Sequence, residues 1–387
     1  MGLHHVWYYA LETRFPKKGE VVHVCGDHDA PPLLQQRLEG RKRDKRPISV
    51  GRKGKVFLQT CTSGRRHYTH RVVKMIRLQD RGTRWRYLGE LEAIAKFSHP
   101  KYSKYFVKLL GWYERSYWLC FAMQIVPGGD LQTYLIQRSA LQEDGSLEIT
   151  SQVLQGLAFL HTEGFAHRDI KPQNALIQQC PTPIEPGSWW VKLSEFGIGK
   201  SPEALTSDAS TLISAYDYMA PELHGQESLP SIDYQAADMW ALGLMTFWTL
   251  TKSRMFSSLG AVYRYEASPD ALFPRGSLDD SHVSSDGQAL IRSLTKPKPD
   301  QRLGSNEAMS HAWVLSSMPS APMIPAECNE PSVSPSGVRT KDKLPLEKPS
   351  WIDVKDKFGD TPLQRAAKDA RMAALKQLLE QGENIEI

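Results

Sequence analysis

The order of apolar and polar positions makes residues 47–124 β-rich. Between residues 47 and 124, short alternating runs predict strands at 55–60 and 69–76. One interruption, at residues 85–97, has its apolar residues at helical spacing. This part therefore predicts a small lobe built on a sheet with one helix against it.

From residue 129 to residue 314 the apolar period becomes helical. Residues 147–161 repeat apolar positions along one face, and residues 237–251 are apolar almost all round, which is typical of a buried central helix. A β-rich lobe followed by a larger helical lobe is an α+β arrangement, and we expect a cleft between the lobes.

Three flanking segments lack a sustained period or differ in composition. Residues 1–46 are interpreted as an N-terminal extension of partial order, and the basic run at its end, Arg41–Arg46, as a solvated linker. Residues 315–350 are rich in Pro, Ser and Lys, which is typical of a linker. Residues 351–387 form a separate unit.

Composition narrows the class of protein. The 387 residues are 41% hydrophobic and 24% charged, which indicates a globular chain of two or three domains. A net charge of +5 is too small to predict nucleic-acid binding. The longest apolar run, Met239–Leu250, is too short for a membrane helix.

The N-terminal residues and the cysteine content indicate the cellular compartment of the protein. The N-terminus lacks the pattern of a secretory signal, and five cysteines without a CxxC pair are typical of reduced thiols. We therefore expect a cytoplasmic protein with neither nucleic-acid nor membrane partners. Nuclear import through the Arg41–Arg46 run is an alternative.

The most specific motif is His167-Arg-Asp-Ile-Lys-Pro-Gln-Asn174. It resembles the catalytic loop of eukaryotic protein kinases, in the form with a lysine two residues after the aspartate that marks serine/threonine kinases. The resemblance covers residues 47–314, with the small lobe at 47–124 and the large lobe at 129–314. It implies the two-lobed kinase fold and transfer of the ATP γ-phosphate to Ser/Thr hydroxyls of protein substrates.

The resemblance also implies roles for this loop, and the chemistry explains them. Phosphoryl transfer requires positioning and charge neutralisation more than covalent chemistry. Asp169 would orient the substrate hydroxyl and accept its proton. Lys171 would place positive charge beside the transferring group, and Asn174 would offer an oxygen to Mg²⁺.

Other family motifs follow in the expected order. Lys74, in Arg71-Val-Val-Lys74, would hold the α- and β-phosphates and pair with Glu90 on the following helix, with Glu92 as the competing partner. Ser49–Val56 aligns with the glycine-rich hairpin that covers phosphates, although Ser49 replaces its first glycine. The other residues that the resemblance places around ATP are Gly51, Gly54, Val56, Val72, Met123, Ile125, Asp130 and Leu176.

Three further residues are expected to be structural. Asp238 would anchor the catalytic loop, and Arg302 would pair with Glu222 in Ala220-Pro-Glu222. A buried ion pair of this kind sets geometry more than it adds stability.

The chain departs from the family at the metal ligand. The Asp-Phe-Gly motif, whose aspartate binds Mg²⁺, is here Glu195-Phe-Gly197. The extra methylene moves the carboxylate by about 1.5 Å, whereas Mg²⁺ requires near-octahedral ligands at about 2.0–2.1 Å. Attenuated transfer with Mg²⁺, or use of Mn²⁺, is therefore expected.

The segment that follows also departs from the family. Ser214 and Ala215 replace the usual Gly-Thr pair, which puts substrate positioning in doubt. Arg168 is a candidate to pair with a phosphate in this segment. The candidate phosphorylation sites are Thr206, Ser207, Ser210 and Thr211.

Two alternatives to an active kinase remain open. One is a pseudokinase scaffold that binds nucleotide and partners without efficient transfer. The other is an interaction protein whose lobe no longer binds ATP.

The C-terminal unit resembles one ankyrin repeat. Thr361 would cap a first helix, Pro362 would occupy its first turn, and Gly382 would end a second helix. A single repeat cannot bury its apolar face, so we expect an incomplete array, with packing on the kinase-like domain as the alternative. The resemblance implies protein partners.

Overall fold

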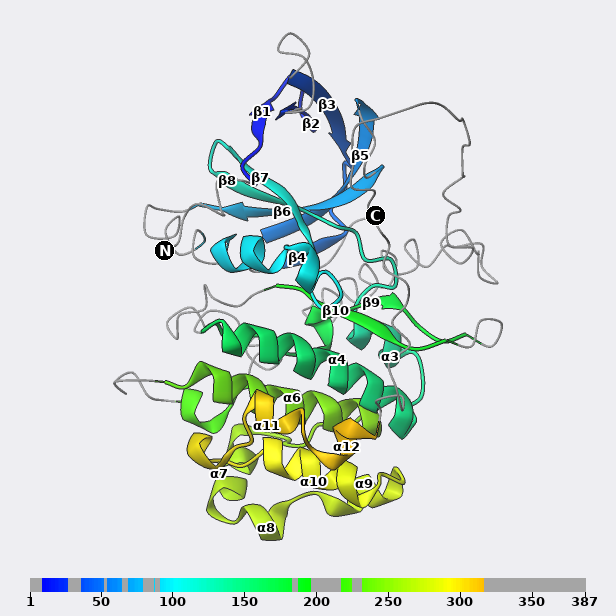
Figure 1. The fold of residues 1–387 in the computed structure, drawn as a ribbon, viewed down its shortest axis with the longest axis vertical. Coiled ribbons are helices and arrows are strands. Elements are labelled where there is room, and N and C mark those ends of the chain that lie inside the picture. The colour runs from blue at the N-terminus through cyan, green and yellow to red at the C-terminus, as the bar shows by residue number, and fades with distance from the viewer. Residues whose placement is uncertain are drawn as a thin grey trace, which may run out of the picture.

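The computed structural model describes residues 9–26, 36–51, 54–64, 69–78, 87, 91–182, 187–195, 217–224 and 232–316. Within these ranges a β-rich small lobe lies above a helical large lobe (Figure 1). The predicted two-lobed α+β arrangement is therefore confirmed. The predicted linker beyond residue 316, and the ankyrin-like unit at 351–387, lie outside the described residues.

The small lobe is built on one antiparallel sheet of eight strands. Along this sheet the order is β1-β2-β3-β5-β6-β8-β7, and β4 pairs with β5 off this path. The strands are β1 (Glu12–Arg14), β2 (Glu20–Gly26), β3 (Gln36–Arg43), β4 (Ser49–Gly51), β5 (Gly54–Ser63), β6 (His70–Arg77), β7 (Leu109–Arg115) and β8 (Trp118–Met123).

Three of these strands lie in the segment that we interpreted as a partly ordered extension. Along β2, Val21 and His23 are buried and Val22 and Val24 are half-buried, which is the alternation of a covered strand. The sequence interpretation missed these strands because the segment lacks a sustained period, and because β3 pairs with the more distant β5 as well as with β2.

The N-terminal segment also closes the sheet. The Leu11 amide donates to Trp112 O at 2.8 Å, and the Trp112 amide donates to Tyr9 O at 2.8 Å. These bonds join the start of β1 to β7, at the opposite end of the strand order, so the sheet curls into a barrel. At this seam the Leu11 side chain packs directly over Gly111, where an added Cβ would lie 2.5 Å from it.

The barrel encloses a small core of its own. Apolar side chains from several strands meet there, among them Val21, Phe57 and Val73. Polar side chains also lie in this core, where Arg71 is hydrogen-bonded to both His23 and Gln59. Burial and the neighbouring Arg71 and Arg41 lower the pKa of His23 to about 3, so this imidazole is neutral at physiological pH.

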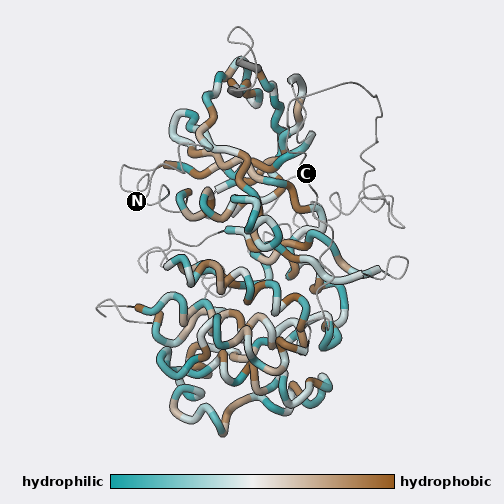
Figure 2. Tube along the Cα trace, in the orientation of Figure 1, coloured by the Kyte–Doolittle hydropathy of each residue, from teal (hydrophilic) through white to brown (hydrophobic). Residues whose placement is uncertain are grey.

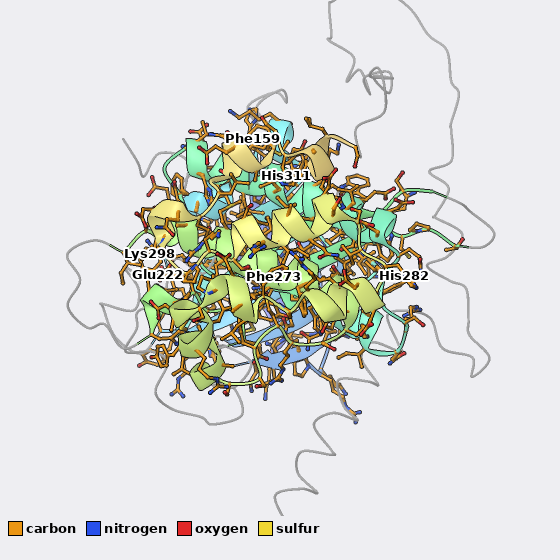
Figure 3. The ribbon with its side chains drawn as sticks, turned by 90° about the horizontal axis from the view of Figure 1, so that it is seen from below. Phe159, Glu222, Phe273, His282, Lys298 and His311 are labelled. Atoms are coloured by element: carbon orange, nitrogen blue, oxygen red, sulfur yellow. The ribbon has the colours of Figure 1, made fainter. Side chains whose placement is uncertain are left out.

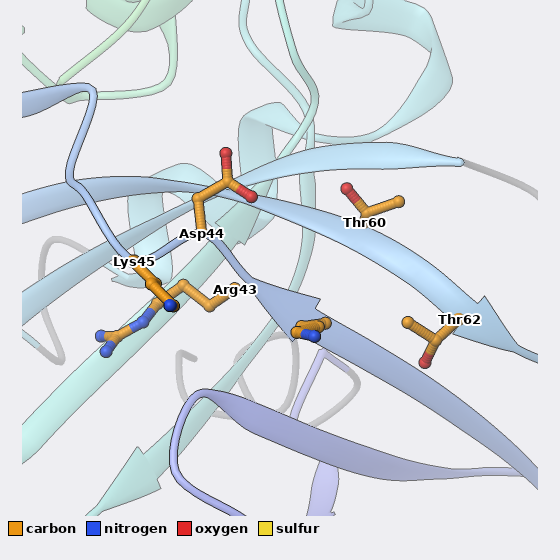
Figure 4. A pocket seen from close by; sticks show the side chains of 6 residues that line it. Arg43, Asp44, Lys45, Thr60 and Thr62 are labelled. Atoms are coloured by element: carbon orange, nitrogen blue, oxygen red, sulfur yellow. The ribbon is translucent and has the colours of Figure 1, made fainter.

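The first three residues of the basic run, Arg41–Arg43, belong to β3, which corrects the interpretation of this part as a solvated linker. Arg41 is only 3% exposed, because alternate residues of β3 point into the barrel. On the outer surface, a shallow cavity of about 290 Å³ is lined by Lys42, Arg43, Asp44, Lys45, Thr60 and Thr62 (Figure 4). Its lining includes none of the predicted catalytic residues.

The remaining elements belong to the large lobe, except for the turn η2, which precedes β7 in the small lobe. A two-stranded sheet pairs β9 (Ala175–Gln179) with β10 (Trp190–Leu193). The helices are α3 (Leu131–Ile136), α4 (Glu143–Thr162), α6 (Tyr234–Thr251), α7 (Leu259–Ala267), α8 (Pro269–Leu272), α9 (Arg275–Asp280), α10 (Ser285–Leu294), α11 (Ser305–Ala308) and α12 (Ala312–Leu315), with 3₁₀ turns η2 (Pro100–Tyr102), η3 (Pro172–Asn174), η6 (Pro221–Leu223) and η7 (Pro299–Gln301).

The predicted central helix is α6, and most of its side chains are buried. It begins at Tyr234, before the apolar run, because the Asp233 carboxylate accepts hydrogen bonds from the amides of Gln235 and Ala236 at 3.0 Å. Hydrophobic and hydrophilic residues alternate along the elements of both lobes (Figure 2), as expected when each element has one buried side. In the described part of the chain, every helix is too short or too polar to span a bilayer.

The seam between the N-terminal segment and β7 can be tested by substitution at Gly111. We expect Gly111→Ala to lower the free energy of unfolding by about 1–3 kcal/mol, because the new methyl group meets Leu11 and the φ of +147° disfavours a side chain. Chemical denaturation measures this change. Adding Leu11→Ala should recover part of the loss.

Gly276→Ala is the matched control, since nothing lies within 4 Å of its Cβ position. Equal losses for Gly111→Ala with and without Leu11→Ala would show that the N-terminal segment does not pack on β7.

Candidate active site

The catalytic-loop residues form a short, hydrogen-bonded turn between α4 and β9. Asp169 and Asn174 are buried, at 8% and 4% exposure. Lys171 Nζ lies 3.2 Å from Asp169 Oδ1, and Asn174 Nδ2 donates to the Asp169 carbonyl at 2.6 Å. The structure thus brings together the three loop residues that the sequence selected.

Asp238 of α6 anchors this loop, as predicted. Its carboxylate, 1% exposed, accepts from the backbone amides of His167 at 2.6 Å and Arg168 at 2.7 Å. Arg168 has a φ of +63°, a conformation that costs about 1–3 kcal/mol and persists only where the surroundings enforce it. The two charge-assisted bonds to Asp238 supply that constraint.

Lys74 and Glu195 meet in a partly buried ion pair. Lys74 Nζ lies 3.1 Å from Glu195 Oε1, with the two side chains 4% and 33% exposed. Lys74 points to this side of β6 because alternate residues of a strand face opposite ways, and its neighbour Val73 faces the barrel interior. The sequence placed both residues at the nucleotide, but did not predict that they touch.

Backbone contacts tie Glu195 to the catalytic loop. The preceding residue, Ser194, donates its amide to Asn174 O at 2.9 Å, and its carbonyl lies 3.1 Å from His167 Nε2. Glu195 itself has a φ of +56°. The end of β10 is therefore held against the loop, so Glu195, Asn174 and Lys74 lie in one place.

The predicted nucleotide residues lie on neighbouring strands. The ladder pairs Gly51 with Gly54, and Val72 with Met123. Gly54 has a φ of +137°, and a Cβ there would lie 2.1 Å from Met75 O, so only glycine fits. These contacts place the glycine hairpin beside β6.

The remaining nucleotide residues lie on β5 and where the two lobes join. Val56 pairs with Lys74, and an isolated bridge joins Asp130 to Leu176. Ile125 is half-buried in the connection between the lobes. The Asp130 carboxylate, which the resemblance places at the ribose, accepts from the Thr133 amide at 2.8 Å and caps α3.

Several predicted residues lie outside the described part of the chain. They are Glu90, the proposed partner of Lys74, together with Phe196, Gly197, Thr206, Ser207, Ser210, Thr211, Ser214 and Ala215.

The predicted ion pair between Arg302 and Glu222 is confirmed in the large lobe. Arg302 Nη1 lies 2.7 Å from Glu222 Oε1, and Arg302 Nη2 donates to Glu222 Oε2 at 3.0 Å, so the ion pair is bidentate. Figure 3 views this end of the lobe from below and labels Glu222 and Lys298 on the same side. The pair joins the segment before α6 to the turn after α10.

Lys192 is a buried amine that the sequence reasoning did not single out. It is 4% exposed on β10, and its Nζ donates to Gln124 Oε1 at 3.3 Å. Burial, together with the nearby Lys108, lowers its pKa to about 8. No sequence signal identifies it, because only the fold brings β10 against the connection between the lobes.

The chain belongs to the protein kinase family, since the model of the protein kinase domain matches residues 43–314. Among curated relatives, the serine/threonine-protein kinase RAD53 of Saccharomyces cerevisiae is 30% identical over 234 residues, which are 58% of this chain and 27% of that protein. The serine/threonine-protein kinase cds1 of Schizosaccharomyces pombe is 29% identical over 198 residues, 50% of this chain and 41% of the relative. The chain thus spans less than half the length of these relatives.

Solved structures show the same fold. A crystal structure of Rad53 1-466 in complex with AMP-PNP has a TM-score of 0.55 and 26% identity, and the match covers 71% of this chain and 65% of that one. A structure of the Rad53 kinase domain and SCD2, with a TM-score of 0.51 and 24% identity, covers 82% of this chain and 95% of that one. The small lobe and large lobe are therefore those of a protein kinase.

The depressed pKa of Lys192 predicts a pH-dependent stability. The unfolded chain keeps this proton up to its ordinary pKa of 10.5, while the folded protein releases it from about pH 8. At pH 7 the full cost of burying the charge is therefore present, and the cost disappears as pH rises from about 8 to 10.5. We expect Lys192→Met to raise Tm at pH 7, with a gain that shrinks toward pH 10.

Circular dichroism melts at several pH values measure this effect, and Lys55→Met at an exposed strand position is the control. A difference between Lys192→Met and the unmodified protein that stays constant from pH 7 to pH 10 would contradict the assignment.

Proposed function

We propose that this protein is a serine/threonine-protein kinase that transfers the ATP γ-phosphate to protein Ser/Thr hydroxyls. The observation that carries the proposal is the convergence of Lys74, Glu195 and the Asp169–Asn174 turn on one place. Lys74 supplies a cation for the nucleotide phosphates, and Asp169 supplies a carboxylate for the acceptor hydroxyl. Lys171, held 3.2 Å from Asp169, adds positive charge beside the acceptor.

The donor groups fit a divalent cation. Asn174 uses its Nδ2 to hold the Asp169 carbonyl, so its Oδ1 remains as an oxygen ligand. The Asn174 oxygen and the Glu195 carboxylate are therefore two protein ligands for a cation. Among the described residues, no group of three His, Cys, Asp or Glu side chains could hold a metal ion without further ligands. We propose that Mg²⁺ or Mn²⁺ binds here with ATP phosphates, where it neutralises their charge.

The pseudokinase alternative is favoured by one observation. Glu195 stands at the metal-ligand position and pairs with Lys74 at 3.1 Å, so each of the two residues already has a partner of opposite charge. Nucleotide and metal must compete with this pair. We propose attenuated transfer as the consequence, with a scaffold that only binds nucleotide as the limiting case.

We also propose roles for the flanking segments. The Thr361–Ala367 motif supports an ankyrin-type unit at 351–387 that binds protein partners. We propose a cytoplasmic location; the nuclear alternative rests on the Arg41–Arg46 run, whose first three residues form the end of β3.

Transfer of radiolabelled phosphate from ATP to a generic protein acceptor, with Mg²⁺ or Mn²⁺, tests the proposed function. We expect Asp169→Asn to lower kcat by about 10²–10⁴-fold, because the amide cannot accept the hydroxyl proton. A nucleotide-induced thermal shift should persist in this variant. Lys74→Met is a second control and should weaken the shift as well as the transfer.

The thermal shift separates the alternatives. A shift of the unmodified protein without transfer would support the scaffold and refute the kinase. No shift and no transfer would refute both.

The attenuation has its own test at position 195. We expect Glu195→Asp to raise the metal-dependent kcat by up to about 10²-fold, because the shorter side chain withdraws from Lys74 and restores the ligand length of the family. Glu195→Gln should lower the rate. No gain from Glu195→Asp, in a folded protein with measurable turnover, would refute attenuation by the longer side chain.

A further inference from the structure

The basic run of the sequence lines the shallow cavity on the outer surface of the small lobe. Thr60 and Thr62 of β5 border it on one side, and the end of β3 with the two residues after it, Lys42–Lys45, borders it on the other (Figure 4). Lys42 lies opposite Thr60 in the ladder, so their side chains share one face of the sheet. Thr62, two residues further along β5, shares this face too. Strand pairing therefore brings hydroxyl groups and an amine together at one cavity.

The charges of the lining favour an anion. Lys42, Arg43 and Lys45 contribute three positive charges and Asp44 contributes one negative charge, so the lining has a net charge of +2. Within the part of the chain that the structure describes, neither lysine has a carboxylate partner, and Asp44 forms no ion pair. The positive charge of the cavity is therefore available to an anion from outside.

Arg43 is held in place without having its hydrogen-bond donors satisfied. Its Cζ lies 4.0 Å from the centroid of the Phe57 ring, and its Nη1 donates to Met75 Sδ at 2.9 Å. A thioether is a weak acceptor, and Arg43 Nε is buried with no hydrogen-bond partner among the described residues. The contacts with Phe57 and Met75 thus fix the guanidinium and leave its charge uncompensated.

A phosphate monoester matches this lining better than other anions. It has a charge of about −1.5 to −2 at pH 7 and three strong acceptor oxygens, which suit a net charge of +2 and several donors. A carboxylate has a single charge and two oxygens. Nucleic acid requires an extended basic surface, whereas the net charge of the whole chain is only +5.

The exposure of the lining indicates how the phosphate is presented. Lys42, Asp44, Lys45 and Thr62 are exposed, so the cavity is open to a group that projects from another polypeptide. Thr60 lies four residues along β5 from Val56, which is about 13 Å at 3.3 Å per residue. The cavity is therefore separate from the proposed nucleotide site.

We propose that this cavity binds a phosphorylated side chain of a protein, phosphoserine or phosphothreonine. The ammonium groups of Lys42 and Lys45 and the hydroxyl groups of Thr60 and Thr62 donate to the phosphate oxygens, and Arg43 adds its charge. Asp44 weakens the attraction. Binding here goes beyond the proposed transfer reaction and does not depend on it.

A fluorescein-labelled peptide of glycine and alanine around one phosphoserine tests the site. It is titrated with the full chain in excess AMP-PNP, which occupies the proposed nucleotide site, and binding is followed by anisotropy. We expect the phosphoserine peptide to bind at least about tenfold more tightly than the same peptide with serine, and more tightly than the peptide with glutamate. Binding should weaken as the salt concentration rises, and inorganic phosphate should compete.

Substitutions in the lining assign the binding to this cavity. Lys42→Met and Lys45→Met should each raise the Kd of the phosphoserine peptide by about tenfold, because each removes a charge-assisted hydrogen bond. Asp44→Asn should lower the Kd, a gain that misfolding does not produce. Lys298→Met, at an exposed position of the large lobe, is the matched control and should leave the Kd unchanged.

Three outcomes would overturn the inference while leaving the kinase function intact. The first is equal binding of the phosphoserine and serine peptides. The second is binding of the phosphoserine peptide that Lys42→Met, Lys45→Met and Asp44→Asn leave unchanged, or that Lys298→Met weakens equally. The third is a glutamate peptide that binds as tightly as the phosphoserine peptide, which would show a surface for acidic peptides instead of a phosphate site.

Discussion

The geometry of the site depends on one carboxylate. Asp238, buried in α6, holds two successive backbone amides of the catalytic loop and so maintains the left-handed conformation of Arg168. The loop in turn holds Ser194, and with it the end of β10. Because α6 is buried along most of its length, this anchor does not move independently of the large lobe. Rigid support of this kind is what phosphoryl transfer requires, since positioning is most of its catalysis.

The small lobe is braced differently, by the N-terminal segment. Strands β1 and β2 cover the face of the sheet that is opposite Lys74. Backbone hydrogen bonds of Tyr9 and Leu11 with Trp112 close the barrel. Side chains of β6 are buried on both faces of the sheet, whereas those of β5 are buried on the inner face only. This double packing restrains β6, the strand that positions Lys74. Residues before the matched kinase domain therefore contribute to the site indirectly, through the rigidity of the sheet.

The contact between Lys74 and Glu195 involves the position at which this chain departs from the metal-binding motif of its family. The glutamate has the same charge as the usual aspartate, and its carboxylate lies 3.1 Å from the lysine amine. An ion pair in a partly buried site is stronger than one in water, since the local dielectric is lower. The same two residues that recruit nucleotide and metal thus also attract each other. Whether the site favours catalysis or binding depends on the balance between these competing attractions.

The sequence by itself determined the two lobes, the order of the motifs and the residues of the catalytic loop, because apolar periodicity and a contiguous motif are local properties. It predicted the Glu222–Arg302 pair and the Asp238 anchor through family resemblance alone. Only the tertiary structure decided that β1–β3 close a barrel, that Lys192 is buried against Gln124, and that Lys42 borders a cavity with Thr62. Each of these joins residues far apart along the chain, and no local pattern encodes which distant surface a strand edge or an amine will meet. The Lys74–Glu195 contact belongs to the same class, since it depends on how β6 and β10 lie in space.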